Sequence, residues 1–485
     1  MPASPNPPCR HAAALLLLAA APLAALASCS ISSGGAVGAP ETKSRLAPPA
    51  KAPDADNDDD EDDDDGDALK AAYADMSRTL GTVTNVPVRG RLVRESGPPD
   101  LLASTPQKEM SQREIKRVPV EIVVLDNDGK NRLRLGVTQS DSEGYINTSF
   151  PLKAGTLEPG LHTLEVRVSG RRAGRTTARL LDTGFTGLVV RSDVDLTYLD
   201  TRFTRKRDML SLLSQSARER STLPAMERVF SALRAGAAGG EDRALVFISG
   251  SPRFFKRVLE ARMTLDGVTH DGILLKPFDD MIMAKVMSLD FGSIVPALKE
   301  QVGYKLVHLM NGRMELPPQA GELLLGDDSE SDFIVYSIYH RFIAGNLDMA
   351  GLENELVRAG LDGSQREPVK TIAQKLRSVL PPSKLVKAIY INRTGSPNSH
   401  HAVKDWVVPG LTHYHAGAWP LILDLYEEGF VSKESVAAVR KRLLSIGQAE
   451  KDLETAHEDG VKSGFLKRET IALFKAGGSA PPAVN

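Results

Sequence analysis

The sequence predicts an α/β protein: a parallel sheet with flanking helices, preceded by a small β-sandwich domain. Three observations lead to this fold class. The chain has 485 residues, which is enough for two or three domains. From about Thr79 to Leu181, short apolar runs with a period of two are separated by turn residues, which is typical of a sandwich. After residue 185, apolar runs alternate with helical stretches, which favours a parallel sheet covered by helices.

The first 28 residues predict a secretory signal peptide, which is not part of the fold. Arg10 precedes an apolar segment, AAALLLLAAAPLAALAS, and small residues follow it. Residues 26–29, LASC, resemble the lipobox of bacterial lipoproteins, whose cysteine is lipidated. An ordinary signal peptide with an incidental cysteine is the alternative. The two cysteines of the chain are Cys9 and Cys29, so processing would leave Cys29 without a disulfide partner, and lipidation would explain its presence.

Residues 29–77 predict a disordered linker. Its segment 54–67, DADNDDDEDDDDGD, holds 11 of the 62 acidic residues, so the rest of the chain has 51 acidic against 60 basic residues. Like charges resist collapse, and the glycine and glutamate of a calcium loop are not in place, so a solvated spacer is favoured over calcium capture. An acyl chain on Cys29 would hold the protein on a membrane of the bacterial cell envelope, at its periplasmic or outer face.

Residues 78–183 predict the β-sandwich. The stretch VPVEIVVLDNDGKNRLRLGVTQ contains an Asp-Asn-Asp-Gly turn between two apolar runs, which indicates a hairpin. In HTLEVRVSG, apolar and polar residues alternate. We find no residues suited to catalysis in this domain.

Residues 184–410 predict the parallel sheet. The runs LVV, ALVFI, ILL, ELLL and AIYI indicate buried strands, and residues 208–236 and 293–312 indicate helices. Amphipathic helices are expected in a C-terminal segment, 411–476, and the tail 477–485 is expected to be disordered.

Polar clusters follow three of the predicted strands. Because the carboxyl ends of parallel strands meet at one edge of the sheet, residues far apart in the sequence can share a site there. The clusters are Asp193-Val194-Asp195-Leu196-Thr197, Ser249-Gly250-Ser251-Pro252 and Gly326-Asp327-Asp328-Ser329-Glu330-Ser331-Asp332. We expect Asp193, Asp195, Ser249, Asp327 and Asp332 to lie close together.

Several carboxylates in one cleft require a cation, and oxygen ligands favour Mg²⁺ over zinc. A carboxylate beside the metal can attack phosphorus and form an aspartyl-phosphate, and a second carboxylate two residues on can transfer protons. Ser249 can donate hydrogen bonds to phosphoryl oxygens. A lysine is also expected, to balance charge on the transferring group. Lys305, in the helix before the third cluster, is the candidate, and Lys276, after the run ILL, is the alternative.

Together these motifs resemble those of haloacid-dehalogenase-like (HAD-like) phosphatases. More narrowly, SDVDLT, FISGSP, the Tyr-Lys pair at 304 and 305, and LLLGDDSESD resemble the actin-patch phosphatidate phosphatase family, over roughly residues 85–400. The resemblance implies a HAD-like Rossmannoid sheet for the catalytic domain. The roles that it implies are nucleophile for Asp193, acid/base for Asp195, phosphate binding for Ser249, Gly250, Lys305 and Thr197, and Mg²⁺ binding for Asp193, Asp195 through its carbonyl, Asp327 and Asp332, the last directly or through water.

Two positions differ from the family pattern. Leu196 replaces an aspartate, which the wider superfamily does not require, so substrate contacts can differ while catalysis remains. Gly-Asp-Asp-Ser replaces Gly-Asp-Ser-Gly, which leaves Asp327 and Asp328 as alternatives for the metal, with position favouring Asp327.

The resemblance implies a Mg²⁺-dependent phosphatase for a phosphomonoester, with a phosphatidate-like lipid favoured and small soluble phosphates as the alternative. A non-catalytic surface lipoprotein that uses its sandwich to bind a partner is the other hypothesis. The histidines His400, His401, His413 and His415 lack clear ligand spacing, which makes zinc the weaker interpretation. No nucleic-acid partner is expected.

Overall fold

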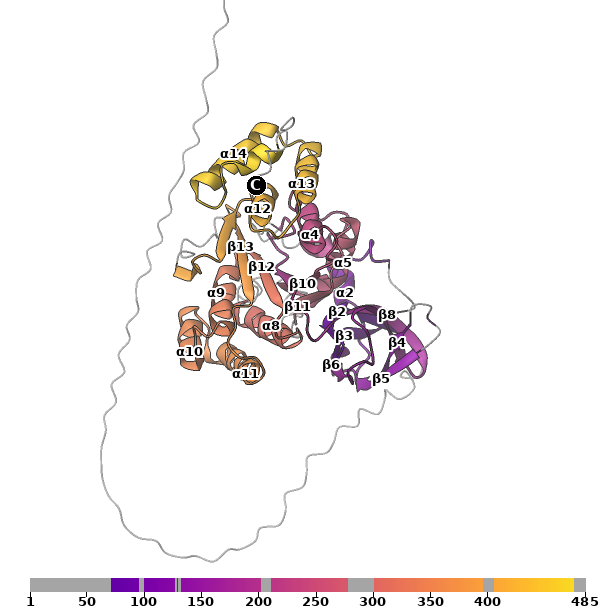
Figure 1. The fold of residues 1–485 in the computed structure, drawn as a ribbon. Coiled ribbons are helices and arrows are strands. Elements are labelled where there is room, and N and C mark those ends of the chain that lie inside the picture. Colours follow the sequence, from indigo (N-terminus) through magenta and orange to yellow (C-terminus); the bar gives the residue numbers. More distant parts are fainter. Residues whose placement is uncertain are drawn as a thin grey trace, which may run out of the picture. The chain divides into compact units, whose positions relative to one another are not determined.

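A computed structural model of the chain describes residues 71–95, 100–126, 129, 132–201, 211–277, 301–395 and 405–474 (Figure 1). All of these residues belong to one compact unit of the chain. The predicted signal peptide, Cys29, the acidic run 54–67 and the tail 477–485 lie outside the described residues. Within the described residues, no helix combines the length and the apolar character needed to cross a bilayer.

The N-terminal part is a mixed sheet of eight strands with one short helix. The elements are β1 (Ala72–Met76), β2 (Thr79–Thr82), β3 (Asn85–Arg94), α2 (Pro106–Met110), β4 (Pro119–Leu125), β5 (Arg132–Gln139), β6 (Tyr145–Pro151), β7 (Gly160–Val168) and β8 (Arg171–Leu181). The predicted hairpin is confirmed, since β4 and β5 pair antiparallel. The sheet begins earlier than expected, because β1 falls in the segment predicted to be a disordered linker and buries Ala74 and Met76 in the core.

The strands hydrogen-bond into one sheet, in the order β1-β3-β2-β8-β7-β4-β5 with β6 on β3, whereas a sandwich has two sheets. The parallel pairing of β2 with β8 joins what would otherwise be separate layers. The end strands β5 and β6 nevertheless meet, since a Cβ on Gly136 would lie 2.6 Å from the ring of Phe150. The sheet therefore folds over a single apolar core.

The second part is a parallel sheet with helices. Its elements are β9 (Leu188–Ser192), α4 (Met226–Ala235), β10 (Ala244–Pro252), the 3₁₀ helix η1 (Arg253–Phe255), α5 (Lys256–Leu265), β11 (Gly272–Lys276), α8 (Val302–Met314), β12 (Gly321–Asp327), α9 (Asp332–Ile343), α10 (Met349–Arg358), α11 (Gly363–Val379), β13 (Val386–Asn392), β14 (Thr412–His415), α12 (Ala418–Glu427), α13 (Lys433–Ser445), α14 (Glu450–Lys462) and η3 (Thr470–Phe474).

All five apolar runs that predicted strands form strands of this sheet, and β14 is a sixth. The strand order is β11-β10-β9-β12-β13-β14, and every neighbouring pair is parallel. The chain adds strands in one direction from β9 to β11 and then in the other from β12 onward. The order reverses between β9 and β12, and ligands in such sheets bind outside the carboxyl ends of strands at the point of reversal. The sheet therefore directs the search for a site to the ends of β9 and β12.

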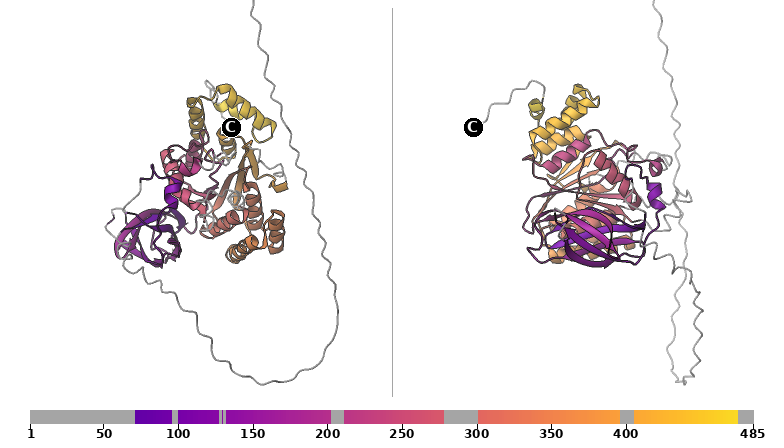
Figure 2. Two further views of the ribbon diagram at one scale, coloured as in Figure 1. Left: turned by 180° about the vertical axis from the view of Figure 1, so that it is seen from behind. Right: turned by 90° about the vertical axis from the view of Figure 1, so that its right-hand side faces the viewer.

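Helices cover both faces of this sheet (Figure 2). Alternate residues of β12 show the reason: Leu323 and Leu325 pack in one apolar cluster with α4, α5 and α12, while Leu324 packs in another with α8, α9 and α11. Strand side chains point to opposite faces in turn, so a run of leucines supports two helical layers.

Two expectations about secondary structure need correction. The helix predicted over 208–236 is interrupted, and α4 starts only at Met226, because Pro224 disfavours helical backbone before it and Ala225 is left-handed, with φ of 61°. Strand β14 lies in the segment assigned to C-terminal helices, and four residues are too few to give a clear periodic pattern.

Candidate active site

Asp193 stands at the point where the strand order reverses. It directly follows β9, and its backbone N–H donates to the carbonyl of Leu325 on β12 at 2.8 Å, which extends the pairing of the two strands. Its side chain is fully buried. The main chain therefore fixes the Asp193 carboxyl between the ends of β9 and β12.

Lys305 places its ammonium group at this carboxyl. From α8, its Nζ donates to Asp193 Oδ1 at 2.7 Å and to Asp332 Oδ1 at 2.6 Å, and it lies 3.2 Å from Glu330 Oε2. The alternative, Lys276, ends β11, which is two strands away from β9. The geometry therefore brings Lys305 into the acidic group.

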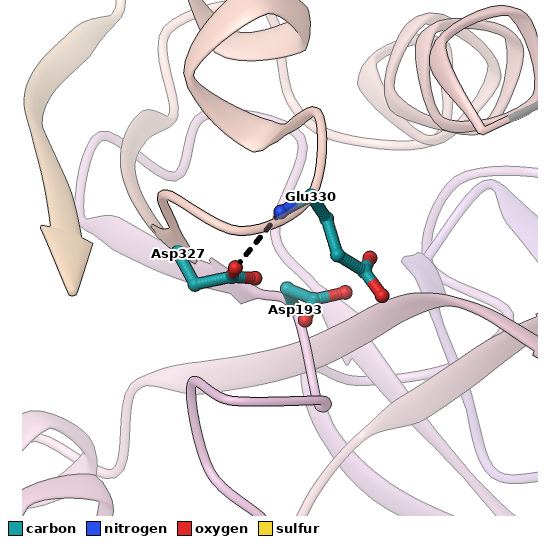
Figure 3. A group of neighbouring side chains, drawn as sticks. All are labelled: Asp193, Asp327 and Glu330. Atoms are coloured by element: carbon teal, nitrogen blue, oxygen red, sulfur yellow. Dashed lines mark hydrogen bonds between the residues drawn. The ribbon is translucent and has the colours of Figure 1, made fainter. Parts of the chain in front are cut away.

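Asp327, at the end of β12, faces Asp193 (Figure 3). Its Oδ1 accepts hydrogen bonds from the N–H groups of Ser329 at 2.7 Å and Glu330 at 3.0 Å, which curls the loop back toward the strand. Carboxylate oxygens of Asp193, Asp327 and Glu330 lie within 4.8 Å of one another. Asp193 Oδ2 and Asp327 Oδ2 are buried and have no hydrogen-bond partner.

Glu330 was not among the predicted site residues. The sequence contained one signal for it, since it lies three residues after Asp327 in an acidic loop. Only the curl of this loop around Asp327 directs the Glu330 side chain toward Asp193.

The other two acidic residues of this loop have protein partners. Asp332, the first residue of α9, bonds Lys305 through Oδ1 and accepts the Asp327 N–H through Oδ2 at 3.3 Å. A Cβ on Gly326 would lie 2.4 Å from the Cβ of Asp332, so only glycine allows this close approach. Asp328 turns away and accepts the N–H and hydroxyl of Thr394 at 2.9 and 2.8 Å.

Asp195 joins the first cluster to the second. Its Oδ2 accepts hydrogen bonds from the hydroxyls of Ser249 at 3.0 Å and Ser251 at 2.7 Å. Ser251 lies in the second motif, but the sequence predicted no role for it. At Gly250, a Cβ would lie 2.2 Å from the amide carbon of Gln301, so the loop and the start of α8 pack closely.

The turn after Asp195 has an unusual backbone. Leu196 is left-handed, with φ of 56°, which is uncommon for a bulky side chain. Asn392, at the end of β13, donates from Nδ2 to the Leu196 carbonyl at 2.7 Å and accepts the Gly417 N–H at 3.1 Å. Asn392 therefore holds the turn, a role that the sequence did not indicate. Thr197, which follows Leu196, is buried and its hydroxyl has no hydrogen-bond partner.

The acidic group is strongly perturbed. Burial, reinforced by the neighbouring carboxylates, raises the pKa of Asp193 and of Asp327 well above the usual range, and burial raises the pKa of Glu330 to about 7. Burial opposes the charge on Lys305 as well, but Asp193, Asp332 and Glu330 hold its pKa well above its usual value. A group of carboxyls that resist ionisation is suited to binding a cation, which would restore their charged form.

The histidines considered for zinc do not form such a group. His413 Nδ1 lies 3.0 Å from Asp424 Oδ2, and His415 Nδ1 lies 3.1 Å from the Gly417 carbonyl. His400 and His401 lie outside the described residues. Over the described ranges, Asp193, Asp327 and Glu330 are the only residues grouped closely enough to hold a metal.

A surface hollow of about 290 Å³ lies elsewhere, between α4 and the residues before β10 and β11. It is at the amino ends of the strands, and its Arg234 is paired with Asp242 and Asp271. The acidic group at the carboxyl ends of β9 and β12, and not this hollow, is therefore the candidate active site.

The fold and the site together define an α/β domain with a buried carboxylate–lysine group at its point of strand reversal. Residues 188–346 match the family described as "Phosphatidate phosphatase APP1, catalytic domain", which confirms the resemblance noted from the motifs. The match runs from β9 to just beyond α9 and includes Asp193, Ser249, Lys305 and Asp327. Residues 188–346, about a third of the chain, are therefore similar to the catalytic domain of that phosphatase family.

No curated protein matches the chain. Solved structures that match include an alkylpurine DNA glycosylase from Pseudomonas fluorescens (14% identity, 22% of this chain and 30% of that chain, TM-score 0.14) and a glycosyl hydrolase family 2 member from Bacteroides cellulosilyticus (12%, 74% and 40%, TM-score 0.22). A third is the exo-chitosanase CsxA of Amycolatopsis orientalis (8%, 67% and 33%, TM-score 0.20). The chain thus spans well under half the length of each of these proteins, and likenesses this weak carry no functional argument.

Proposed function

We propose that the chain is a Mg²⁺-dependent, HAD-like phosphatase that hydrolyses a phosphomonoester through an aspartyl-phosphate on Asp193. One observation carries the proposal. Asp193 Oδ2 and Asp327 Oδ2 are buried and have no partner, and they belong to carboxylates that lie within 4.8 Å of each other beside a buried lysine. A buried polar atom without a partner is costly, and a bound ligand would compensate for it.

The residues present fit a magnesium ion. Asp193, Asp327 and Glu330 offer only carboxylate oxygens, which Mg²⁺ prefers, and the cluster has more negative than positive groups. Asp332 is better suited to orienting the ion's waters, because both of its oxygens already accept hydrogen bonds from the protein. The ion would offset negative charge on the phosphoryl group.

The reaction that this arrangement supports has two steps. An Asp193 oxygen attacks phosphorus, the bond from phosphorus to the ester oxygen breaks, and Asp195 gives its proton to the leaving oxygen. Asp195 then takes a proton from water, the water oxygen attacks phosphorus, and the bond to Asp193 breaks with release of phosphate. Ser249 and Ser251 hold the Asp195 carboxyl in place before the substrate binds.

The phosphoryl oxygens would be bound by Lys305 and by the Ser249 hydroxyl, with the Gly250 N–H and Thr197 as further donors. Thr197 supports this role because its buried hydroxyl has no protein partner. A phosphatidate-like lipid is the favoured substrate, in keeping with the family description. Lipidation of Cys29 would place the enzyme on a membrane of the cell envelope, near such a substrate. The non-catalytic alternative is disfavoured, since the whole acidic group is kept.

A phosphate-release assay tests the proposal. The full chain in detergent is given lipid and soluble phosphate esters, with Mg²⁺ or with chelator. We expect Mg²⁺-dependent release. Asp193→Asn should lose several orders of magnitude on every ester, since it removes the nucleophile.

A second variant separates the roles of the paired aspartates. Asp195→Asn should lose about a hundred- to ten-thousandfold, with partial recovery on an aryl phosphate whose leaving group needs no proton. Asp328→Asn, which can still accept from Thr394, is the control and should remain active. Comparable activity of wild type and Asp193→Asn on any ester would contradict the mechanism.

A further inference from the structure

One buried arginine beside the candidate active site has no acidic partner among the residues that the structure describes. Six arginines are buried in the described part of the chain: Arg179, Arg191, Arg220, Arg243, Arg257 and Arg313. Five of them pair with a carboxylate at 3.5 Å or less. Arg220 pairs with none among the described residues, although it is only 5% exposed.

The contacts of Arg220 leave its guanidinium partly unsatisfied. Nη2 donates to the Leu212 carbonyl at 2.7 Å, and Cζ lies 4.9 Å from the centre of the Phe255 ring. Nε is buried and has no partner. A charged group in this state is costly to bury, and structural arginines elsewhere in this protein avoid the cost by pairing.

Arg220 lies between the two loops that carry the catalytic motifs. The segment after it runs antiparallel to the chain that follows Asp195, since Asp200 N–H donates to the Ser221 carbonyl at 2.9 Å and Leu199 bridges Thr222. Phe255, under the guanidinium, closely follows the Ser249 loop. Burial lowers the pKa of Arg220 to about 10, and Asp195 acts in the opposite direction.

Two further polar groups, in the segment after Asp195 that pairs with the residues following Arg220, have no hydrogen-bond partner. Thr201, which follows Asp200, is 4% exposed, and Thr197 is 1% exposed. The hydroxyl of each is buried without a hydrogen bond. Buried polar groups without a partner therefore occur in both of these paired segments, as expected where a polar ligand binds.

The net charge of the site indicates that a bound phosphate ester needs a further positively charged side chain. Among the described residues, one lysine, Lys305, contacts the acidic group, through Asp193, Glu330 and Asp332. With Asp195 and Asp327 the group has five carboxyls, so a divalent cation still leaves an excess of negative charge when all five are ionised. A phosphate ester brings further negative charge. A buried, unpaired guanidinium next to Asp195 is the group that could receive it, since arginine binds phosphate oxygens in bidentate fashion.

We propose that Arg220 is a substrate-binding residue whose guanidinium binds an anionic oxygen of the phosphate ester, beside the Asp195 carboxyl. The inference rests on the proposed function for the identity of the ligand. The oxygen belongs either to the scissile phosphoryl group or to a second phosphate on the leaving group, and the two sources share one chemistry.

Calorimetric titration of the full chain in detergent tests this at fixed free Mg²⁺, with inorganic phosphate and with pyrophosphate as probes. Arg220→Gln removes the charge and keeps a donor for the Leu212 carbonyl. We expect its affinity for phosphate to fall roughly 10- to 100-fold, the range for a hydrogen bond to a charged group. A loss seen only with pyrophosphate assigns Arg220 to a second phosphate. Arg218→Met, an exposed arginine of the same segment, should match the wild type.

Mg²⁺ binding without phosphate separates an anion site from general damage, because loss of a nearby cation should leave Mg²⁺ affinity unchanged or higher. Arg220→Lys, which lacks the planar fork, serves if Arg220→Gln does not fold, and should lose at least about fivefold. Affinities within twofold of wild type for both probes, in a folded Arg220→Gln or failing that Arg220→Lys, would overturn the inference.

The two proposals can fail separately. A wild type that cleaves no ester but binds phosphate through Arg220 would end the proposed function and keep the anion site. An active wild type, together with unchanged phosphate and pyrophosphate affinity in Arg220→Gln, would keep the proposed function and end the anion site.

Discussion

Replacing Lys305 by methionine removes the one cation that contacts the acidic group among the described residues. Its Nζ lies 2.7 Å from Asp193 Oδ1 and 2.6 Å from Asp332 Oδ1, and none of the three side chains is more than 1% exposed. Removing one partner of such a buried pair costs about 3–5 kcal/mol, because the other charge is left without compensation. We expect a loss of this size at pH 8.

The loss should shrink in acid. Burial and the neighbouring carboxylates raise the pKa of Asp193 even with the lysine present, and without it the folded-state pKa rises further. The folded variant then binds more protons than the unfolded chain, so its stability falls as pH rises from the unfolded value of about 4 through the folded value. At pH 5.5 protonation removes part of the unpaired charge, and the variant should lie closer to wild type.

Urea unfolding in chelator, followed by tryptophan fluorescence, measures the free energy of unfolding of wild type and variant at pH 8 and at pH 5.5. The two tryptophans, Trp406 and Trp419, are buried in the α/β domain and therefore report on it. Lys370→Met is the matched control, since its pairs with Glu353 and Glu367 lie on the partly exposed surface of α11 and contribute little. A loss below about 1 kcal/mol at pH 8, or an equal loss at both pH values, would refute the reasoning.

The remaining predictions concern Glu330, the metal and the anchor. Glu330, with its pKa raised to about 7, binds more protons in the folded state than in the unfolded chain between about pH 4.5 and 7, so the metal-free protein should lose stability as pH rises through this range. Millimolar Mg²⁺ should raise the melting temperature, and more at pH 8 than at pH 6, because it binds deprotonated carboxylates; an active sample whose melting temperature ignores both Mg²⁺ and chelator would count against the site. Cys29→Ala should give an unprocessed or released protein in detergent-phase partitioning, and equal partitioning of two processed proteins would exclude a lipid anchor.

Most strands of the parallel sheet could be predicted from local patterns in the sequence. Each of the five apolar runs became a parallel strand, because a strand buried on both faces needs consecutive apolar residues, as in the leucines of β12. Strand β14 was missed because its short, polar sequence, THYH, has no such pattern. The sandwich was expected from alternation within strands, but alternation says nothing about pairing between strands, and the parallel contact of β2 with β8 makes a single sheet.

The residues of the candidate site divide in the same way. Asp193, Ser249 and Asp327 could be predicted because each lies in or next to the carboxyl-terminal part of a strand, and these strands end at one edge of the sheet. Loop residues could not be ranked, because the direction of a side chain in a loop depends on hydrogen bonds that the sequence does not display. Asp328 and Glu330 show this, since one turns to Thr394 and the other to Asp193.

The sequence by itself determined the order of the motifs, the strands that carry them and the class of chemistry, because all three depend on residue type and short-range pattern. Only the tertiary structure decided which carboxyls face one another, that Lys305 rather than Lys276 enters the acidic group, and that Arg220 is buried with no carboxylate partner in the described part of the chain. These facts depend on contacts between segments up to about 200 residues apart, such as the hydrogen bond from Asn392 to Leu196, and no local pattern encodes them.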